Sequence, residues 1–227
     1  MAKLMSRAIN CLNPNHGDPC GQCEVCRAIQ TESTMDVLEL DAASNNSVDN
    51  IRELLEQVRY PAQMGKYKVY IIDEVHMLST AAFNALLKTL EEPPEYVVFI
   101  LATTELHKLP ATIISRCQRF DFRRISNDAI VSRLSYIADC EGIRFEPDAL
   151  SRIAKAAAGG MRDAVSLLEL CAGGAADVNE DRVADVLGLS GYDMMKRFAD
   201  AVAGKSVSGL IDMIEEVQSS SKDITVF

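Results

Sequence analysis

Two adjacent carboxylates, Asp73 and Glu74, directly follow the apolar residues 69–72. An apolar run of this length, bounded by polar residues, is typical of a strand buried on both faces, as in a parallel sheet. Ligands of α/β sheets bind at the carboxyl ends of the strands. Asp73 is suited to orient a hydrated Mg²⁺, and Glu74 to polarise an attacking water. The alternative is a strand that ends in two solvated acids.

Four cysteines near the N-terminus have the spacing of a metal site. Eight residues separate Cys11 from Cys20, and Cys20, Cys23 and Cys26 follow one another in two C-x2-C steps. Structural zinc takes four such thiolates in a tetrahedron and keeps no open position. We therefore predict a structural Zn²⁺ bound by these four cysteines. His16 is a weaker alternative ligand, and a set of free thiols is the other alternative. No catalytic metal is indicated.

Strands and helices alternate through the first half of the chain. Hydrophobic patterns predict strands at 35–41, 69–73 and 96–102, and helices at 2–10, 26–31, 48–59 and from 79 to the prolines at 93–94. This alternation predicts a parallel α/β sheet with right-handed crossovers. The third strand ends in Thr103-Thr104-Glu105, which again places hydroxyls at a strand end. Within 112–122 we expect a short helix and a final strand.

From residue 126 onward the pattern is entirely helical. The expected helices, separated mostly by glycines, are 126–141, 147–157, 160–172, 179–187, 191–203 and 205–219. We therefore divide the chain into an α/β domain at 1–125 with a zinc module at 11–26, a helical domain at 126–189, and the start of a further helical domain at 190–227.

Composition restricts the class of protein. The net charge of −10 over 227 residues does not favour nucleic acid, so any DNA contact must be local or shared with other subunits. No apolar run reaches the roughly eighteen residues of a membrane span, and we expect a cytoplasmic protein. Seven cysteines, an odd number, argue against a disulfide framework. We expect Cys117, Cys140 and Cys171 to be small core residues, and His76 and His107 to pack or to face solvent.

Five segments carry a resemblance to a known family: LDAASNNSVDNIREL, VYIIDEVHMLS, FNALLKTLEEPPE, FILATTE and ISRCQRF. They resemble the gamma/tau subunits of the bacterial DNA polymerase III clamp loader, which are AAA+ ATPases. The resemblance covers essentially the whole chain. It implies an AAA+ core with a zinc module, a helical lid domain, and the start of a helical oligomerisation domain.

The resemblance also implies roles for individual residues. Asp73 and Glu74 correspond to the Walker B pair, which orients Mg²⁺ and activates water. Thr103 corresponds to the sensor-1 hydroxyl that contacts the γ-phosphate, with Thr104 as the near alternative. Arg116 corresponds to an arginine finger that acts on ATP held by a neighbouring subunit. Arg162 corresponds to sensor 2. A surface role for Arg116 and a simple helix-start role for Arg162 are the alternatives.

The chain departs from the family in one respect. The P-loop pattern G-x-x-x-x-G-K-[S/T], which the family carries just upstream of the helix that begins here at Met1, does not occur in the sequence. We therefore expect an N-terminally truncated chain whose sheet lacks one interior strand. Such a chain is expected not to bind or hydrolyse ATP alone. We also expect its C-terminus to lie inside an oligomerising domain.

The implied function is that of a subunit of the DNA polymerase III holoenzyme, a nucleotidyltransferase complex, which loads a sliding clamp onto primed DNA with Mg²⁺–ATP. The implied partners are the delta and delta-prime subunits, further gamma/tau copies, the sliding clamp and primed DNA. The alternative function is that of a non-hydrolysing structural subunit resembling delta-prime. The LDAASNN segment and the intact Asp73-Glu74 pair argue against this alternative. A stand-alone zinc-dependent enzyme is a more distant possibility.

Overall fold

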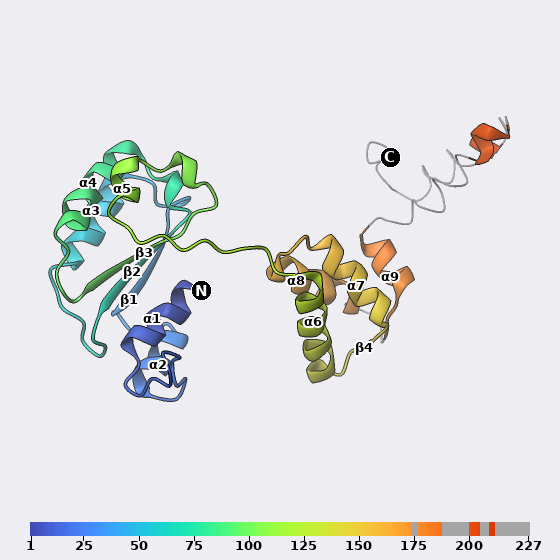
Figure 1. Cartoon of the computed structure of the whole chain (residues 1–227), viewed down its shortest axis with the longest axis horizontal. Coiled ribbons are helices and arrows are strands. Elements are labelled where there is room, and N and C mark those ends of the chain that lie inside the picture. Colours follow the sequence, from blue (N-terminus) through green and yellow to red (C-terminus); the bar gives the residue numbers. More distant parts are fainter. Residues whose placement is uncertain (174–176, 188–199, 205–208, 212–227) are drawn as a thin grey trace. The chain divides into compact units, whose positions relative to one another are not determined.

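The computed structural model in Figure 1 describes residues 1–173, 177–187, 200–204 and 209–211. The chain forms two compact units, Met1–Phe120 and Asp121–Phe227. Most of the helices expected at 191–203 and 205–219 lie outside the described residues.

A parallel sheet forms the centre of the first unit, as predicted. Its strands are β1 (Val37–Asp41), β2 (Lys68–Asp73) and β3 (Val97–Leu101), paired in the order β1-β2-β3. The sheet formed by these three described strands is continuous, because β2 pairs with β1 on one side and with β3 on the other. Asp41 is in register with Asp73, and Ile72 is in register with Leu101. The carboxyl ends of the three strands therefore meet at one edge of the sheet.

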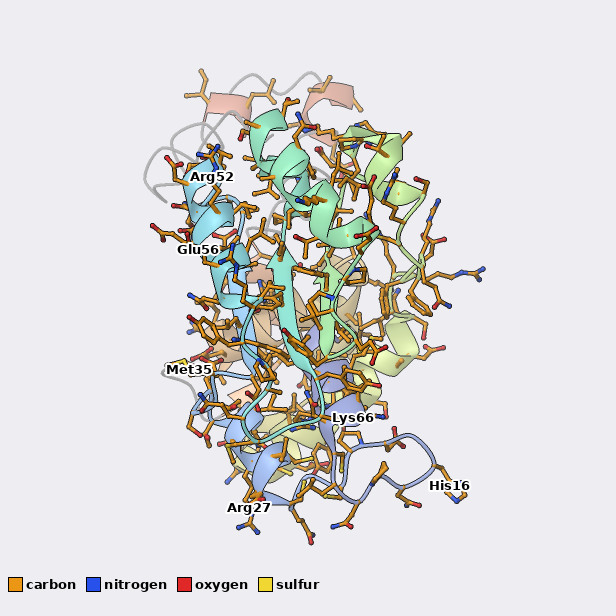
Figure 2. All side chains as sticks on the ribbon, turned by 90° about the vertical axis from the view of Figure 1, so that its left-hand side faces the viewer. His16, Arg27, Met35, Arg52, Glu56 and Lys66 are labelled. Atoms are coloured by element: carbon orange, nitrogen blue, oxygen red, sulfur yellow. The ribbon has the colours of Figure 1, made fainter. Side chains whose placement is uncertain are left out.

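Two helices cover one face of this sheet (Figure 1). They are α3 (Val48–Gln57) and α4 (Thr80–Glu91). Each begins at a serine whose hydroxyl accepts a backbone N–H bond, Ser47 from Asn50 and Ser79 from Ala82, which satisfies one of the free amides of the first turn. Figure 2 shows Arg52 and Glu56 on the outer side of α3. The inner sides form a buried core with the sheet that includes Ile51, Ile72, Val75, Phe83 and Leu86.

The N-terminal helices α1 (Ala2–Asn10) and α2 (Glu24–Gln30) lie side by side and are joined by the cysteine-bearing loop. Asn10 connects α1 to the segment just before β2, because its side-chain amide exchanges two hydrogen bonds with the backbone of Tyr67, at 2.7 and 3.0 Å. Asp36 holds the same segment. This buried carboxylate accepts backbone N–H bonds of 2.7 Å from each of the residues Gln63, Met64 and Gly65.

Short helices follow the strands β2 and β3. They are η1 (Val75–Met77), η2 (Leu106–Lys108) and α5 (Ala111–Ile114). The prediction of a strand after α5 was wrong. Residues 118–126 adopt neither helix nor strand. Phe120 and Phe122 in this segment are 60% and 73% exposed. Their alternating pattern is that of a strand, but no described strand pairs with the segment.

The second unit is a helical bundle, as predicted. Its helices are α6 (Asn127–Glu141), α7 (Pro147–Ala156), α8 (Met161–Ala172) and α9 (Glu180–Val186). Its core includes Ile130, Leu134, Leu150, Ile153 and Leu168. Two short parallel strands, β4 (Arg144–Phe145) and β5 (Asp177–Val178), were not predicted, since two-residue strands carry no periodic signal.

The isolated cysteines were predicted correctly in one case of three. Cys171 is buried in the core of the second unit. Cys117 and Cys140 are exposed, so the prediction that they are core residues was wrong. Cys117 lies in the turn after α5, and Cys140 lies on the outer side of α6.

Candidate functional site

The predicted pair of acids lies at the carboxyl end of β2, the central strand of the sheet. Asp73 is the exposed last residue of β2, and its Oδ1 accepts the backbone N–H of Glu74 at 3.0 Å. Glu74 has φ 47° and ψ 43°, the left-handed region that residues other than glycine rarely adopt. The backbone on both sides is held to the next strand, because Ala102 donates to Ile72 and accepts from Val75, each at 2.9 Å. Such strained backbone is found preferentially at functional sites.

The hydroxyls after β3 contact this pair of residues at the end of β2. Thr104 donates a hydrogen bond from Oγ1 to Oε2 of Glu74 at 3.2 Å. Thr103, the predicted sensor, instead accepts the backbone N–H of Glu105 at 3.0 Å and lies 3.0 Å from Nδ1 of His76. The structure therefore brings Glu74 and both threonines into one cluster, with the direct contact to Glu74 made by Thr104.

His76 also belongs to this cluster, whereas from its sequence we expected only that it packs or faces solvent. Its side chain is only 8% exposed. Nδ1 lies 3.3 Å from Oε2 of Glu74, and Nε2 lies 3.6 Å from Oε2 of Glu105. The spacing Asp73-Glu74-x-His76 is a signal that could have placed it here, because one turn of 3-10 helix after Glu74 returns the ring toward β3.

The charged surroundings of His76 extend to a lysine. Lys108 pairs with Glu105, and its ammonium group holds the pKa of that carboxyl below its usual range, with a smaller contribution from His76.

At the end of β1, Asp41 accepts hydrogen bonds from the backbone of Ala43 and the hydroxyl of Ser44. The Ser44 bond is the main reason that the pKa of Asp41 is lowered. The carboxylate of Asp41 is thus used within its own loop.

Arg116, the predicted arginine finger, is held elsewhere in the first unit. Nη1 donates to the carbonyl of Thr112 at 2.7 Å and to Oγ of Ser115 at 3.3 Å, and Nη2 donates to Oε1 of Glu91 at 2.6 Å. Among the contacts of the described residues, none joins Arg116 to the acids at the end of β2. Arg162, the predicted sensor 2, is an exposed residue in the first turn of α8 in the second unit.

The four predicted zinc ligands come together in the first unit. The Sγ atoms of Cys11, Cys20, Cys23 and Cys26 all lie within 4.8 Å of one another. A tetrahedral zinc ion with bonds of about 2.3 Å to sulfur needs sulfurs about 3.8 Å apart, so this cluster fits one. The alternative ligand His16 is exposed and points outward from the loop (Figure 2).

Backbone amides surround these thiols. Successive N–H groups donate from Cys20 to Sγ of Cys11 at 3.2 Å, from Cys23 to Sγ of Cys20 at 3.3 Å, and from Cys26 to Sγ of Cys23 at 3.4 Å. Amide donors from Leu12 and Cys26 lower the pKa of Cys23 to about 6. Burial raises the pKa of Cys26 to about 12. The cluster can hold a metal ion once the thiols are deprotonated.

The parallel sheet, followed by a helical unit, has the AAA+ fold. The solved Holliday junction branch migration motor RuvB of Thermotoga maritima has this fold. The match has a TM-score of 0.57 at 18% identity and covers 73% of this chain and 55% of that one.

The helices of the described residues are each too short or too polar to span a membrane.

Sequence comparisons define the family. A family described as DNA polymerase III, delta subunit, matches residues 1–126, and one described as DNA polymerase III clamp loader subunit, ATPase lid domain, matches residues 129–170. DNA polymerase III subunit tau of Bacillus subtilis is 48% identical over 98% of this chain and 40% of its own length. The same subunit of Escherichia coli is 43% identical over 93% of this chain and 34% of its own length. The chain belongs to the gamma/tau family of DNA polymerase III clamp-loader subunits. It spans about two fifths or less of these two relatives.

Proposed function

We propose that this chain is part of a gamma/tau subunit, which acts in DNA replication by loading the sliding clamp onto primed DNA. The chain would supply the Walker B acids and both sensors of an ATPase site but, without a P-loop, would not bind or hydrolyse ATP alone. The observation that carries the proposal is the cluster at the end of β2 and β3, where the strained residue Glu74 accepts a hydrogen bond from Thr104 and where His76 contacts both Glu74 and Thr103. The tau subunits of Bacillus subtilis and Escherichia coli share 48% and 43% of their aligned residues with this chain.

The strand-end residues suit ATP hydrolysis. The exposed carboxylate of Asp73 is a hard oxygen ligand suited to the water shell of Mg²⁺, which would neutralise charge on the phosphates. Glu74 would take a proton from the attacking water, and the Thr103 hydroxyl would contact the γ-phosphate. The bond from Thr104 falls on Oε2 of Glu74, so Oε1 is the oxygen suited to accept that proton.

Two arginines would complete the chemistry from outside this cluster. Arg116 would act on ATP bound to a neighbouring subunit, where a guanidinium stabilises charge on the transferred phosphoryl group. Arg162 would contact the nucleotide from the lid domain. The neighbours proposed for this role are further gamma/tau copies. Delta, delta-prime, the sliding clamp and primed DNA are the other proposed partners of the complex.

We assign the four-cysteine cluster to structural zinc. Its thiols fit a closed tetrahedral site, and in the small module of α1 and α2 a metal would replace a larger apolar core. We also assign residues 1–125 to the AAA+ core, 126–189 to the lid, and 190–227 to an oligomerisation domain.

The substitution Glu74→Gln tests the proposal. In the full-length protein assembled with its clamp-loader partners, clamp and primed DNA, the variant should bind ATP with unchanged affinity and hydrolyse it about 10²–10⁴-fold more slowly. The matched control is Glu95→Gln, an exposed acid before β3, which should leave turnover unchanged. Wild-type hydrolysis in the Glu74→Gln assembly would refute the proposed role of this site.

A second function is favoured by one observation, the match of residues 1–126 to a family described as DNA polymerase III, delta subunit. In that case the chain would be a structural subunit resembling delta-prime that supplies Arg116 without hydrolysing ATP. The same experiment separates the two functions. In a structural subunit Glu74→Gln would be silent, while Arg116→Ala would still slow hydrolysis by a neighbour.

A further inference from the structure

The ring of His76 lies between the two parts of the proposed hydrolytic site. It is carried by η1, directly after Glu74, and it reaches Thr103 after the neighbouring strand β3. Nδ1 is 3.0 Å from the Thr103 hydroxyl oxygen and 3.3 Å from Oε2 of Glu74. One ring nitrogen thus faces both the proposed base and the proposed phosphate contact.

We propose that His76 is a positioning residue whose Nδ1–H group is shared between Thr103 and Glu74, and that it couples phosphate contact to the orientation of the base. This inference rests on the proposed function. Its physical basis is the number of hydrogen-bond donors and acceptors in the cluster.

The Thr103 hydroxyl has two acceptor sites and one proton. One acceptor site takes the backbone N–H of Glu105 at 3.0 Å. If Nδ1 of His76 carries its proton, it occupies the second site, and the Thr103 proton is left to point toward a phosphate oxygen. If Nδ1 lacks the proton, its lone pair accepts the Thr103 proton, and the electron-rich nitrogen still lies 3.3 Å from Oε2 of the Glu74 carboxylate with no proton between them. The second arrangement sets two acceptors against each other, so the geometry favours a proton on Nδ1.

Nδ1 of His76 and Oγ1 of Thr104 both contact the same oxygen of Glu74. Thr104 donates to Oε2 at 3.2 Å, and Nδ1 of His76 lies 3.3 Å from that oxygen. The hydrogen bond from Thr104 and the close contact with Nδ1 of His76 both fall on Oε2, which orients the carboxylate and leaves Oε1 for water. A base held in this way needs no reorientation before proton transfer.

The ring itself has little freedom to turn away. Its side chain is 8% exposed, and η1 is closed by backbone bonds from Met77 to Glu74 at 2.8 Å and from Leu78 to Val75 at 3.2 Å. On the other side of the ring, Nε2 faces the Glu105 carboxylate at 3.6 Å. Lys108 pairs with that carboxylate and offsets its charge.

Three variants in the full-length protein, assembled with its clamp-loader partners, test the inference. The side-chain amide of asparagine places its nitrogen near the position of Nδ1, whereas that of glutamine reaches the position of Nε2. His76→Asn should therefore keep kcat within about threefold of wild type, while His76→Gln and His76→Ala should lower kcat about 10–100-fold with unchanged ATP affinity. His107→Asn, at an exposed histidine of η2, is the control and should have no effect.

A readout without nucleotide tests the proton position directly. Nitrogen NMR of histidine-labelled chain at alkaline pH, with the His76 signal identified by its loss in His76→Asn, should show the proton on Nδ1. A proton on Nε2 would overturn the inference, as would equal losses of kcat in the Asn and Gln variants. If the wild-type assembly hydrolyses no ATP, the proposed function fails; wild-type hydrolysis that is insensitive to His76→Gln refutes the coupling alone.

Discussion

Nη2 of Arg116 lies 2.6 Å from Oε1 of Glu91, on the last turn of α4 in the same chain. The side chains of Arg116 and Glu91 are 33% and 50% exposed, so the ion pair is in contact with solvent. Exposed pairs of this kind contribute about 0.2–1 kcal/mol to stability. In the proposed role on a neighbouring subunit, Arg116 would give up this exposed ion pair at little cost in free energy.

Paired substitutions distinguish a local role of Arg116 from a role on a neighbour. Arg116→Ala should slow ATP hydrolysis by the assembled complex about 10³-fold or more, because the charge on the transferred phosphoryl group loses its stabilisation. Glu91→Gln should change the rate less than about fivefold, since only the exposed pair is lost. Steady-state hydrolysis with clamp and primed DNA measures both rates. Equal losses in the two variants would mean that Arg116 acts through Glu91.

The thiols of the cysteine cluster should differ in reactivity in metal-free chain. The pKa of Cys23 is lowered to about 6 by amide donors, so its thiolate forms as the pH rises through about 6. The pKa of Cys26 is raised to about 12 by burial, so this thiol stays protonated at neutral pH. Since the thiolate is the nucleophile, iodoacetamide should modify Cys23 before Cys26 at pH 7.

Peptide mass spectrometry after timed alkylation measures this order. Loading with Zn²⁺ should protect all four cysteines of the cluster, while the exposed residue Cys140 serves as an internal control that reacts in both samples. Alkylation of the four thiols at the same rate with and without Zn²⁺ would exclude the assigned metal site.

Replacing either of two tyrosines by phenylalanine should change the stability of the first unit, in opposite directions for the two positions. Tyr70 is fully buried in β2, and its hydroxyl has no hydrogen-bond partner among the described residues. Tyr70→Phe removes that hydroxyl and keeps the ring stacked on Phe99, so it should stabilise the first unit by about 1 kcal/mol. Tyr96→Phe should destabilise it by about 1 kcal/mol, because Oη of Tyr96 donates to the carbonyls of Val58 and Arg59.

Urea denaturation followed by circular dichroism measures both tyrosine variants against wild type. The two variants differ from it by the same chemical change, loss of one hydroxyl. A shift of the midpoint in the same direction for both would contradict the hydrogen-bond assignment.

The buried carboxylate of Asp36 should be a major source of local stability. It accepts three backbone N–H bonds of 2.7 Å, and Asp36→Ala leaves these partly buried amides without that acceptor. We expect a loss of about 3 kcal/mol. Asp49→Ala is the control, since Asp49 is an exposed acid paired with Arg52 and should cost less than about 1 kcal/mol.

Hydrogen exchange at residues 63–65 is the corresponding local measurement. In the Asp36→Ala chain these three amides should exchange much faster than in wild type. Unchanged protection would show that the carboxylate does not hold the segment.

The sequence by itself determined the order of the three strands of the parallel sheet and of the longer helices, and the position of two acids at a strand end. These features are local: an apolar run followed by Asp73 and Glu74 marks a buried strand and its end without knowledge of any partner. The spacing of the four cysteines likewise predicted their assembly, because a metal site on one short loop needs few long-range contacts. The roles assigned to Thr103, Arg116 and Arg162 remain predictions.

Only the tertiary structure decided which side chains meet across neighbouring strands. The register of β2 against β3 places Thr104 on Glu74 and His76 on Thr103, and no pattern within either strand contains that register. The same reason explains the errors. Residues 118–126 have the alternation of a strand, but a strand forms only where a partner strand is available, and the burial of a cysteine such as Cys140 depends on which side of its helix meets the core.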